Sequence, residues 1–172
     1  MKSKFLLLLC FYCINAKAQS SVNSPEKTAF IPTDEFCKSI KEIAELASQN
    51  KLTTLKQDKF KSIFYNSETS YNSIKKISTA LENFIEDDTE FGNLKFEALL
   101  KNYDTNADAA KTDFMVIVKK AEDCLGKKAS IPSANRLEVY LHYKNCKVTI
   151  NTFFSNNISK WINTIILENE PH

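Results

Sequence analysis

Between residues 105 and 154 the spacing of apolar residues changes from that of a helix to that of strands, so the fold must contain both. Thr105 stands three residues before Asp108, the spacing at which a hydroxyl and a carboxylate cap the first turn of a helix. Apolar residues then recur at three- and four-residue steps before Gly126, which is typical of a helix end: Ala107, Ala110, Phe114, Ile117, Ala121 and Cys124. We therefore predict a helix over 105–126.

Beyond Pro132, apolar and polar residues alternate in two runs on either side of Lys144-Asn145. Alternation with a period of two places successive side chains on opposite faces of a strand. We therefore predict a half-buried hairpin with strands at Leu137–Tyr143 and Lys147–Phe154. Its turn lacks the glycine that tight two-residue hairpins favour.

The two ends of the chain have helical spacing. After Pro32, Thr33 is placed to cap a helix that ends near Gln49-Asn50, with Phe36, Ile40, Ile43, Ala44 and Ala47 buried. Residues 157–168 predict a final helix with one apolar face, formed by Ile158, Trp161, Ile162, Ile165 and Ile166.

The middle of the chain allows two interpretations. Residues 71–85 have apolar spacing that fits a helix, and two glycines in 172 residues favour a mainly helical protein. Residues 94–100 alternate like a strand, and the new capping signal at Asp104-Thr105 indicates that the preceding segment is not helical. We predict a single α+β domain over 33–170, with an N-terminal helix, antiparallel strands, a central helix, and a C-terminal hairpin and helix. An all-α bundle is the alternative, and residues 71–86 stay open between helix and strands.

The first 18 residues have the pattern of a signal peptide. Lys2 and Lys4 precede an apolar core from Phe5 to Ile14, and small residues at Ala16 and Ala18 indicate cleavage before Gln19. This core has about ten residues, whereas a membrane-spanning helix needs about 20. We expect a secreted or periplasmic protein without a membrane anchor after cleavage, and a flexible lead-in over 19–32.

The net charge of the chain argues against nucleic acid and anionic membrane surfaces as partners. Without Lys2, Lys4 and Lys17, the 23 basic residues of the chain become 20, against 21 acidic ones. A nearly neutral chain without a basic cluster is a poor candidate for binding nucleic acid or an anionic membrane surface.

Several short motifs occur in a characteristic order. Phe36-Cys37-Lys38 lies in the predicted first helix, and Phe96-Glu97-Ala98 and Tyr103-Asp104-Thr105 follow in and after the predicted strand. Phe114 and Cys124-Leu125 lie in the central helix, before the hairpin. Over roughly residues 34–154 this order resembles a loose family of small secreted bacterial α+β proteins of uncharacterised function.

The resemblance implies a fold, a compartment and a disulfide, but no activity. Three cysteines follow the predicted cleavage site, and an oxidising compartment permits one disulfide among them. The family pairs the first helix with the central one, which implies a Cys37–Cys124 bond and a free, poorly reactive Cys146. Cys124–Cys146 is the main alternative. The chain departs from the family at residues 77–80, where a Pro-Gly turn is expected, and in its C-terminal helix.

Two acidic segments are candidate cation sites. Asp104 to Asp108 reads D-x-N-x-D like the start of a calcium loop, but Ala109 and Met115 stand where that loop needs glycine and a bidentate acid. Helix capping explains the same residues. The acidic run 86–90 is typical of a solvated turn, with weak cation binding as the alternative. We predict no metal site and no cofactor.

The sequence contains no established catalytic motif. The sharpest enzymatic hypothesis is a thiolate–imidazole pair of Cys146 and His142, which lie near each other across the hairpin turn. A buried thiol and a surface histidine explain both residues more simply. We predict a non-enzymatic protein that acts through contact with another protein. The alternatives are a small thiol enzyme or hydrolase, and a carrier with an apolar ligand between sheet and helices.

Overall fold

The computed structural model describes residues 32–57, 59–60, 71–73, 76–88, 93–131 and 137–170. The predicted signal peptide and the lead-in as far as residue 31 lie outside them. The elements in chain order are α1 (Asp34–Ser48), the 3-10 helix η1 (Leu52–Leu55), β1 (Lys59–Phe60), β2 (Tyr71–Ser73), β3 (Glu82–Asp88), β4 (Asn93–Tyr103), α2 (Ala107–Leu125), β5 (Glu138–Tyr143), β6 (Cys146–Ser155) and β7 (Lys160–Asn169).

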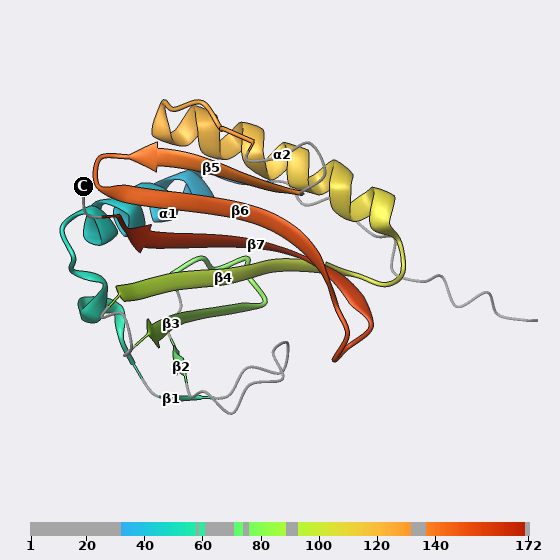
Figure 1. The fold of residues 1–172 in the computed structure, drawn as a ribbon, viewed down its shortest axis with the longest axis horizontal. Coiled ribbons are helices and arrows are strands. Elements are labelled where there is room, and N and C mark those ends of the chain that lie inside the picture. The colour runs from blue at the N-terminus through green and yellow to red at the C-terminus, as the bar shows by residue number, and fades with distance from the viewer. Residues whose placement is uncertain are drawn as a thin grey trace, which may run out of the picture.

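The seven strands of the described residues belong to one antiparallel sheet in the order β1-β2-β3-β4-β7-β6-β5. Helix α2 carries the chain from β4, in the middle of the sheet, to β5 at its edge (Figure 1). The chain then returns through β6 to β7, which pairs with β4. The mixed α+β class is thus confirmed, and the all-α alternative is wrong.

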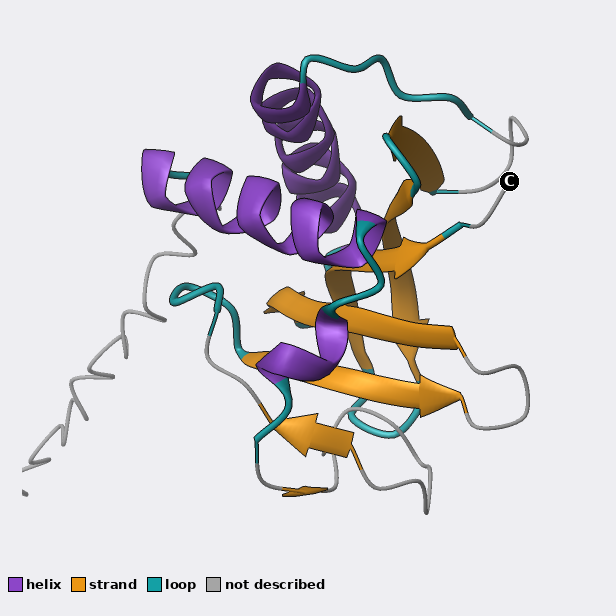
Figure 2. Cartoon of the chain, turned by 90° about the vertical axis from the view of Figure 1, so that its left-hand side faces the viewer, coloured by secondary structure: helices purple, strands orange, loops and turns teal. Residues whose placement is uncertain are grey.

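Both helices cover the same face of the sheet and cross each other there (Figure 2). The predicted stripe of α1 is buried in full, and its residues pack with the inward side of α2 over the sheet. The sheet contributes to this core chiefly Phe96, Ala98, Val148, Ile150, Ile165 and Leu167. Each large aliphatic side chain buried there contributes roughly 1.5–3 kcal/mol relative to exposure.

The helix ends show where local sequence decides the structure. The Thr33 hydroxyl accepts a hydrogen bond from Phe36 N, which confirms the predicted cap of α1. For α2 the predicted cap is wrong, because the Asn106 side chain rather than Thr105 accepts from Ala109 N, at 3.0 Å. Gly126 ends α2 at a φ of +62°, a conformation that side chains disfavour.

The predicted C-terminal helix is wrong, since residues 160–169 form strand β7. This strand lies in the interior of the sheet, and four consecutive residues, 162–165, are buried, so side chains on both of its faces are covered. Ile165 packs in the core under the helices, whereas Ile162 packs with Phe84 and Leu99 on the other face. Burial on two faces removes the alternation that marks a strand, and the isoleucines of this segment happen to have helical spacing. Ile162, Thr164, Ile165 and Ile166 are β-branched, which favours a strand over a helix.

Where they are described, residues 71–86, left open from the sequence, form β2, a turn over 77–80 and most of β3. The Asn83 side chain holds this turn by pairing with the backbone of Ile77: its Oδ1 accepts from Ile77 N and its Nδ2 donates to Ile77 O, each at 3.0 Å. The buried side-chain amide of Asn83 thus stabilises a turn at the position where the family resemblance predicts a Pro-Gly turn.

The hairpin formed by β5 and β6 is confirmed. Tyr143 pairs with Cys146 across a two-residue turn, in which Lys144 adopts a φ of +54° in the absence of glycine. On the other side of β5, Ser130 forms an isolated bridge with Tyr140. This bridge occupies backbone groups that an edge strand would otherwise offer to another chain.

Candidate functional site

An apolar groove lies between the outer side of α2 and the edge strand β5. Its volume is about 410 Å³. Its described apolar lining comes from α2, from the segment after it and from the start of the β5–β6 hairpin: Phe114, Met115, Val118, Ala129, Ile131, Leu137 and Val139. Lys119 and Glu122 add charged groups at the groove.

Part of this apolar surface faces solvent. Met115 is 60% exposed and Ile131 is 66% exposed, and Val116 next to Met115 is 41% exposed. A shallower hollow of about 470 Å³ lies on the other side of Met115, where Pro32 and Lys120 also contribute. The Met115 side chain therefore lines both hollows and lies between them.

The segment 127–131 forms one wall of the groove and is held at two points. The Glu122 carboxylate accepts a hydrogen bond from Ala129 N at 2.9 Å and lies 3.5 Å from Lys128 Nζ. The next residue, Ser130, exchanges backbone hydrogen bonds of 2.8 and 2.9 Å with Tyr140 on β5. The bond from Ala129 N, with help from the Lys128 charge, lowers the pKa of Glu122 below its ordinary value.

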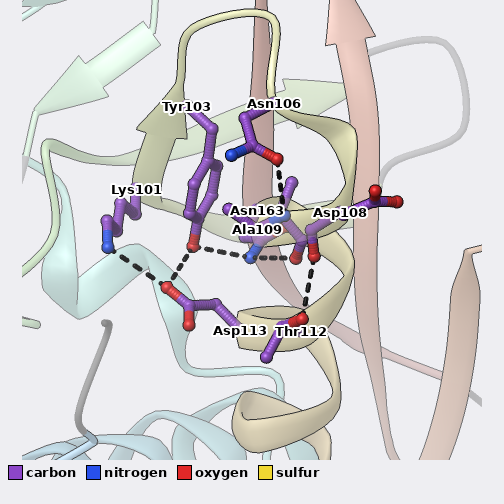
Figure 3. A network of polar contacts seen from close by, with 9 residues as sticks. Lys101, Tyr103, Asn106, Asp108, Ala109, Thr112, Asp113 and Asn163 are labelled. Carbon is purple, nitrogen blue, oxygen red and sulfur yellow. Dashed lines mark hydrogen bonds and ion pairs between the residues drawn. The ribbon is translucent and has the colours of Figure 1, made fainter. Parts of the chain in front are cut away.

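A buried polar cluster joins the other side of α2 to the sheet (Figure 3). A bulge in β4 between Leu99 and Lys101 brings Lys101 opposite Asn163 on β7. Asp113 of α2, only 4% exposed, accepts from Tyr103 Oη at 2.8 Å and from Lys101 Nζ at 3.1 Å. Asn163 Nδ2 donates to Tyr103 Oη and to the carbonyl of Ala110, each at 3.0 Å.

This cluster positions α2 on the sheet. Burial, followed by the hydrogen bond to Asp113, raises the pKa of Tyr103, so that its hydroxyl stays protonated and donates. Two atoms beside the cluster, Thr152 Oγ1 and Asn163 Oδ1, lack a hydrogen-bond partner among the described residues. The sequence did carry a signal for this cluster, because Asp113 is three residues after Ala110 and four before Ile117, within the apolar stripe of α2.

Cys146 and His142 do not form the thiolate–imidazole pair of the alternative enzymatic hypothesis. His142 lies opposite Lys147 and Cys146 opposite Tyr143, so the two side chains point to opposite faces of the sheet. Cys146 is 1% exposed, and burial raises the pKa of its thiol to about 12. The exposed His142 instead places Nδ1 2.8 Å from a carboxylate oxygen of Glu170.

The native thiol of Cys146 should therefore react slowly. We expect iodoacetamide at pH 8 to alkylate it at least about a hundred times more slowly in the native protein than in urea, because both burial and the raised pKa suppress the thiolate. Intact-mass spectrometry over time would measure the two rates. Equally fast labelling of the native protein would contradict the burial of this thiol.

Cys37 and Cys124 form a disulfide in the structure, with Cα atoms 5.3 Å apart. The crossing of α1 and α2 brings the start of one helix to the end of the other (Figure 2). Cys146 lies near the opposite end of α1. It pairs with Asn169 on the adjacent strand β7, and the Asn169 side chain donates a hydrogen bond to the carbonyl of Ala47, close to the end of α1, at 2.9 Å. The alternative bond between Cys124 and Cys146 is not formed.

The candidate cation sites have other roles where the structure describes them. Asn106 caps α2, and Asp104 pairs with Lys160 at 3.3 Å. Residues 86–88 of the acidic run belong to β3, and residues 89–90 lie outside the described part of the chain. Within the described ranges no three His, Cys, Asp or Glu residues are grouped to hold a metal ion.

No protein family, curated protein or solved structure matches this chain. The resemblance to small secreted bacterial proteins therefore stays a prediction. The candidate site must be judged from its own chemistry, which is apolar, partly exposed and bordered by paired charges.

Proposed function

We propose that the protein is a secreted, non-enzymatic binding protein that holds apolar side chains of a partner protein in the groove between α2 and β5. The observation that carries this proposal is the exposure of Met115 and Ile131 at this groove, with Val116 exposed at the adjoining hollow. Contiguous exposed apolar surface is typical of interaction sites, and methionine is enriched in them because it adapts to different partners.

The geometry favours contact through side chains rather than through an added strand. Ser130 already pairs with the outward backbone groups of Tyr140, in the middle of β5. At the opposite edge of the sheet, the described part of the chain gives β1 two residues, Lys59–Phe60. A partner helix or loop that inserts apolar side chains beside Met115 fits this site better than strand addition.

The proposed location outside the cytoplasm has one support besides the signal-like N-terminus. The Cys37–Cys124 bond suits an oxidising compartment. None of the described helices is long and apolar enough to cross a membrane.

Site-specific photo-crosslinking in cells that export the protein would test the proposal. A photoreactive residue at Met115 should yield a discrete crosslinked protein, whereas the same residue at the exposed Lys38 of α1 should not. Ile131→Glu, which places a charge in the groove, should reduce the Met115 product at least about tenfold, because burial of an unpaired charge is costly. Equal products from positions 115 and 38 would contradict the proposal.

The groove volume also favours a second candidate function, the binding of a small apolar molecule. A volume of about 410 Å³ falls in the range of small-molecule sites, roughly 300–1,000 Å³. Native mass spectrometry of the exported protein would distinguish the two functions. A bound mass below about 1 kDa that Ile131→Glu removes would favour the carrier, and would replace protein contact as the function of the groove.

A further inference from the structure

We propose that Glu122 is a latch that holds the segment 127–131 as a wall of the groove, so that this one side chain sets the shape of the binding surface. The biological use of the latch rests on the function proposed above. The latch itself can be measured without any partner.

The backbone makes such a latch necessary. Gly126 ends α2 in a left-handed conformation and turns the chain away from the helix. The described residues that follow, 127–131, belong to no helix or strand apart from the single bridge at Ser130. Their position therefore depends on individual contacts rather than on a continuous ladder of hydrogen bonds.

Glu122 supplies one of these contacts from a rigid element. It lies on the last turn of α2, and its carboxylate receives the N–H of Ala129, seven residues further along the chain, at 2.9 Å. A hydrogen bond from a backbone N–H to a carboxylate is stronger than one between neutral groups. The ion pair with Lys128 contributes less, because that side chain is 82% exposed and its nitrogen is 3.5 Å away.

The two fixed residues are adjacent and are tied to opposite sides of the groove. Glu122 ties Ala129 to α2, and Ser130 is tied to Tyr140 on β5. The side chains of Ala129 and Ile131, on either side of Ser130, line the groove. Without the Glu122 carboxylate, the wall keeps the bridge to β5, the backbone bond from Lys127 N to Glu122 O and the packing of Ala129 against the core, but it loses the hydrogen bond that ties Ala129 to α2.

Amide hydrogen exchange by NMR would test the latch on the full chain. In Glu122→Ala, the exchange of the Ala129 N–H, normalised to the N–H of Ile117 inside α2, should be at least about tenfold faster than in the wild type. Glu122→Gln keeps an oxygen acceptor and should restore at least part of the protection. Lys128→Ala keeps the carboxylate and should leave protection nearly unchanged.

The normalisation separates a local latch from a general loss of stability, which would change both amides together. Unchanged Ala129 exchange in Glu122→Ala would overturn the proposal, and so would equal losses in the alanine and glutamine variants.

A photoreactive residue at Met115 then tests whether the latch serves binding: its crosslinked product should fall in Glu122→Ala and recover in Glu122→Gln. Faster exchange with an unchanged product would overturn the role of the latch in binding, whereas a missing product in the wild type would overturn the proposed function alone.

Discussion

Replacing Cys37 with serine should lower the free energy of unfolding by about 4–5 kcal/mol. The disulfide closes a loop with a sequence separation of 87 residues, and the chain-entropy model assigns a crosslink of this length that stabilisation, because it restricts the unfolded chain. A typical domain has a stability of roughly 5–15 kcal/mol, so the loss is a large share of the whole. Urea denaturation without reductant would measure it, and Cys124→Ser should give the same loss.

Cys146 provides the matched control. The thiol of Cys146 is 1% exposed, so serine at this position would place a hydroxyl in the core. Cys146→Ala avoids that penalty and should cost roughly 1–2 kcal/mol for the lost packing. If peptide mapping under non-reducing conditions found Cys146 in the bridge, both the pairing and the family resemblance would have to be withdrawn.

The sequence predicts the elements that bury one face. Helix α1, helix α2 and the β5–β6 hairpin each have one apolar side, so their periods of 3.6 and 2 survive in the order of the residues. Strand β7 has buried side chains on both faces because it lies inside the sheet, between β6, whose paired residues are 5 to 23 positions away along the chain, and β4, whose paired residues are 58 to 73 positions away. Only its β-branched composition indicated a strand.

The candidate groove depends even more on tertiary structure. In the sequence, Met115 stands only where a calcium loop would need an acid, and its place at the groove follows from the packing of α2 beside β5. No local pattern specifies that Ile131 and Met115 border the same hollow. The Asp113 cluster differs, since a carboxylate inside the apolar stripe of a helix requires a buried partner, although the sequence does not say that Tyr103 and Lys101 provide it.

Asp113→Ala should lower the free energy of unfolding by roughly 2–4 kcal/mol. The substitution leaves the buried hydroxyl of Tyr103 without its acceptor and Lys101 without its carboxylate partner. We expect a value below the full cost of a broken buried ion pair, because the Lys101 side chain is 22% exposed and can reach solvent. For a domain of this size the loss corresponds to roughly 2–4 °C in melting temperature per kcal/mol.

Asp123→Ala is the control on the same helix. Asp123 forms an ion pair with Lys119 at 2.9 Å, but both side chains are more than half exposed, so its loss should cost less than about 0.5 kcal/mol. A double-mutant cycle with Tyr103→Phe then isolates the contact from general effects on α2, and we expect a coupling energy of about 1 kcal/mol or more. Strictly additive losses would show that the Tyr103 hydroxyl and the Asp113 carboxylate do not stabilise each other, and the cluster would then not be what fixes α2 on the sheet.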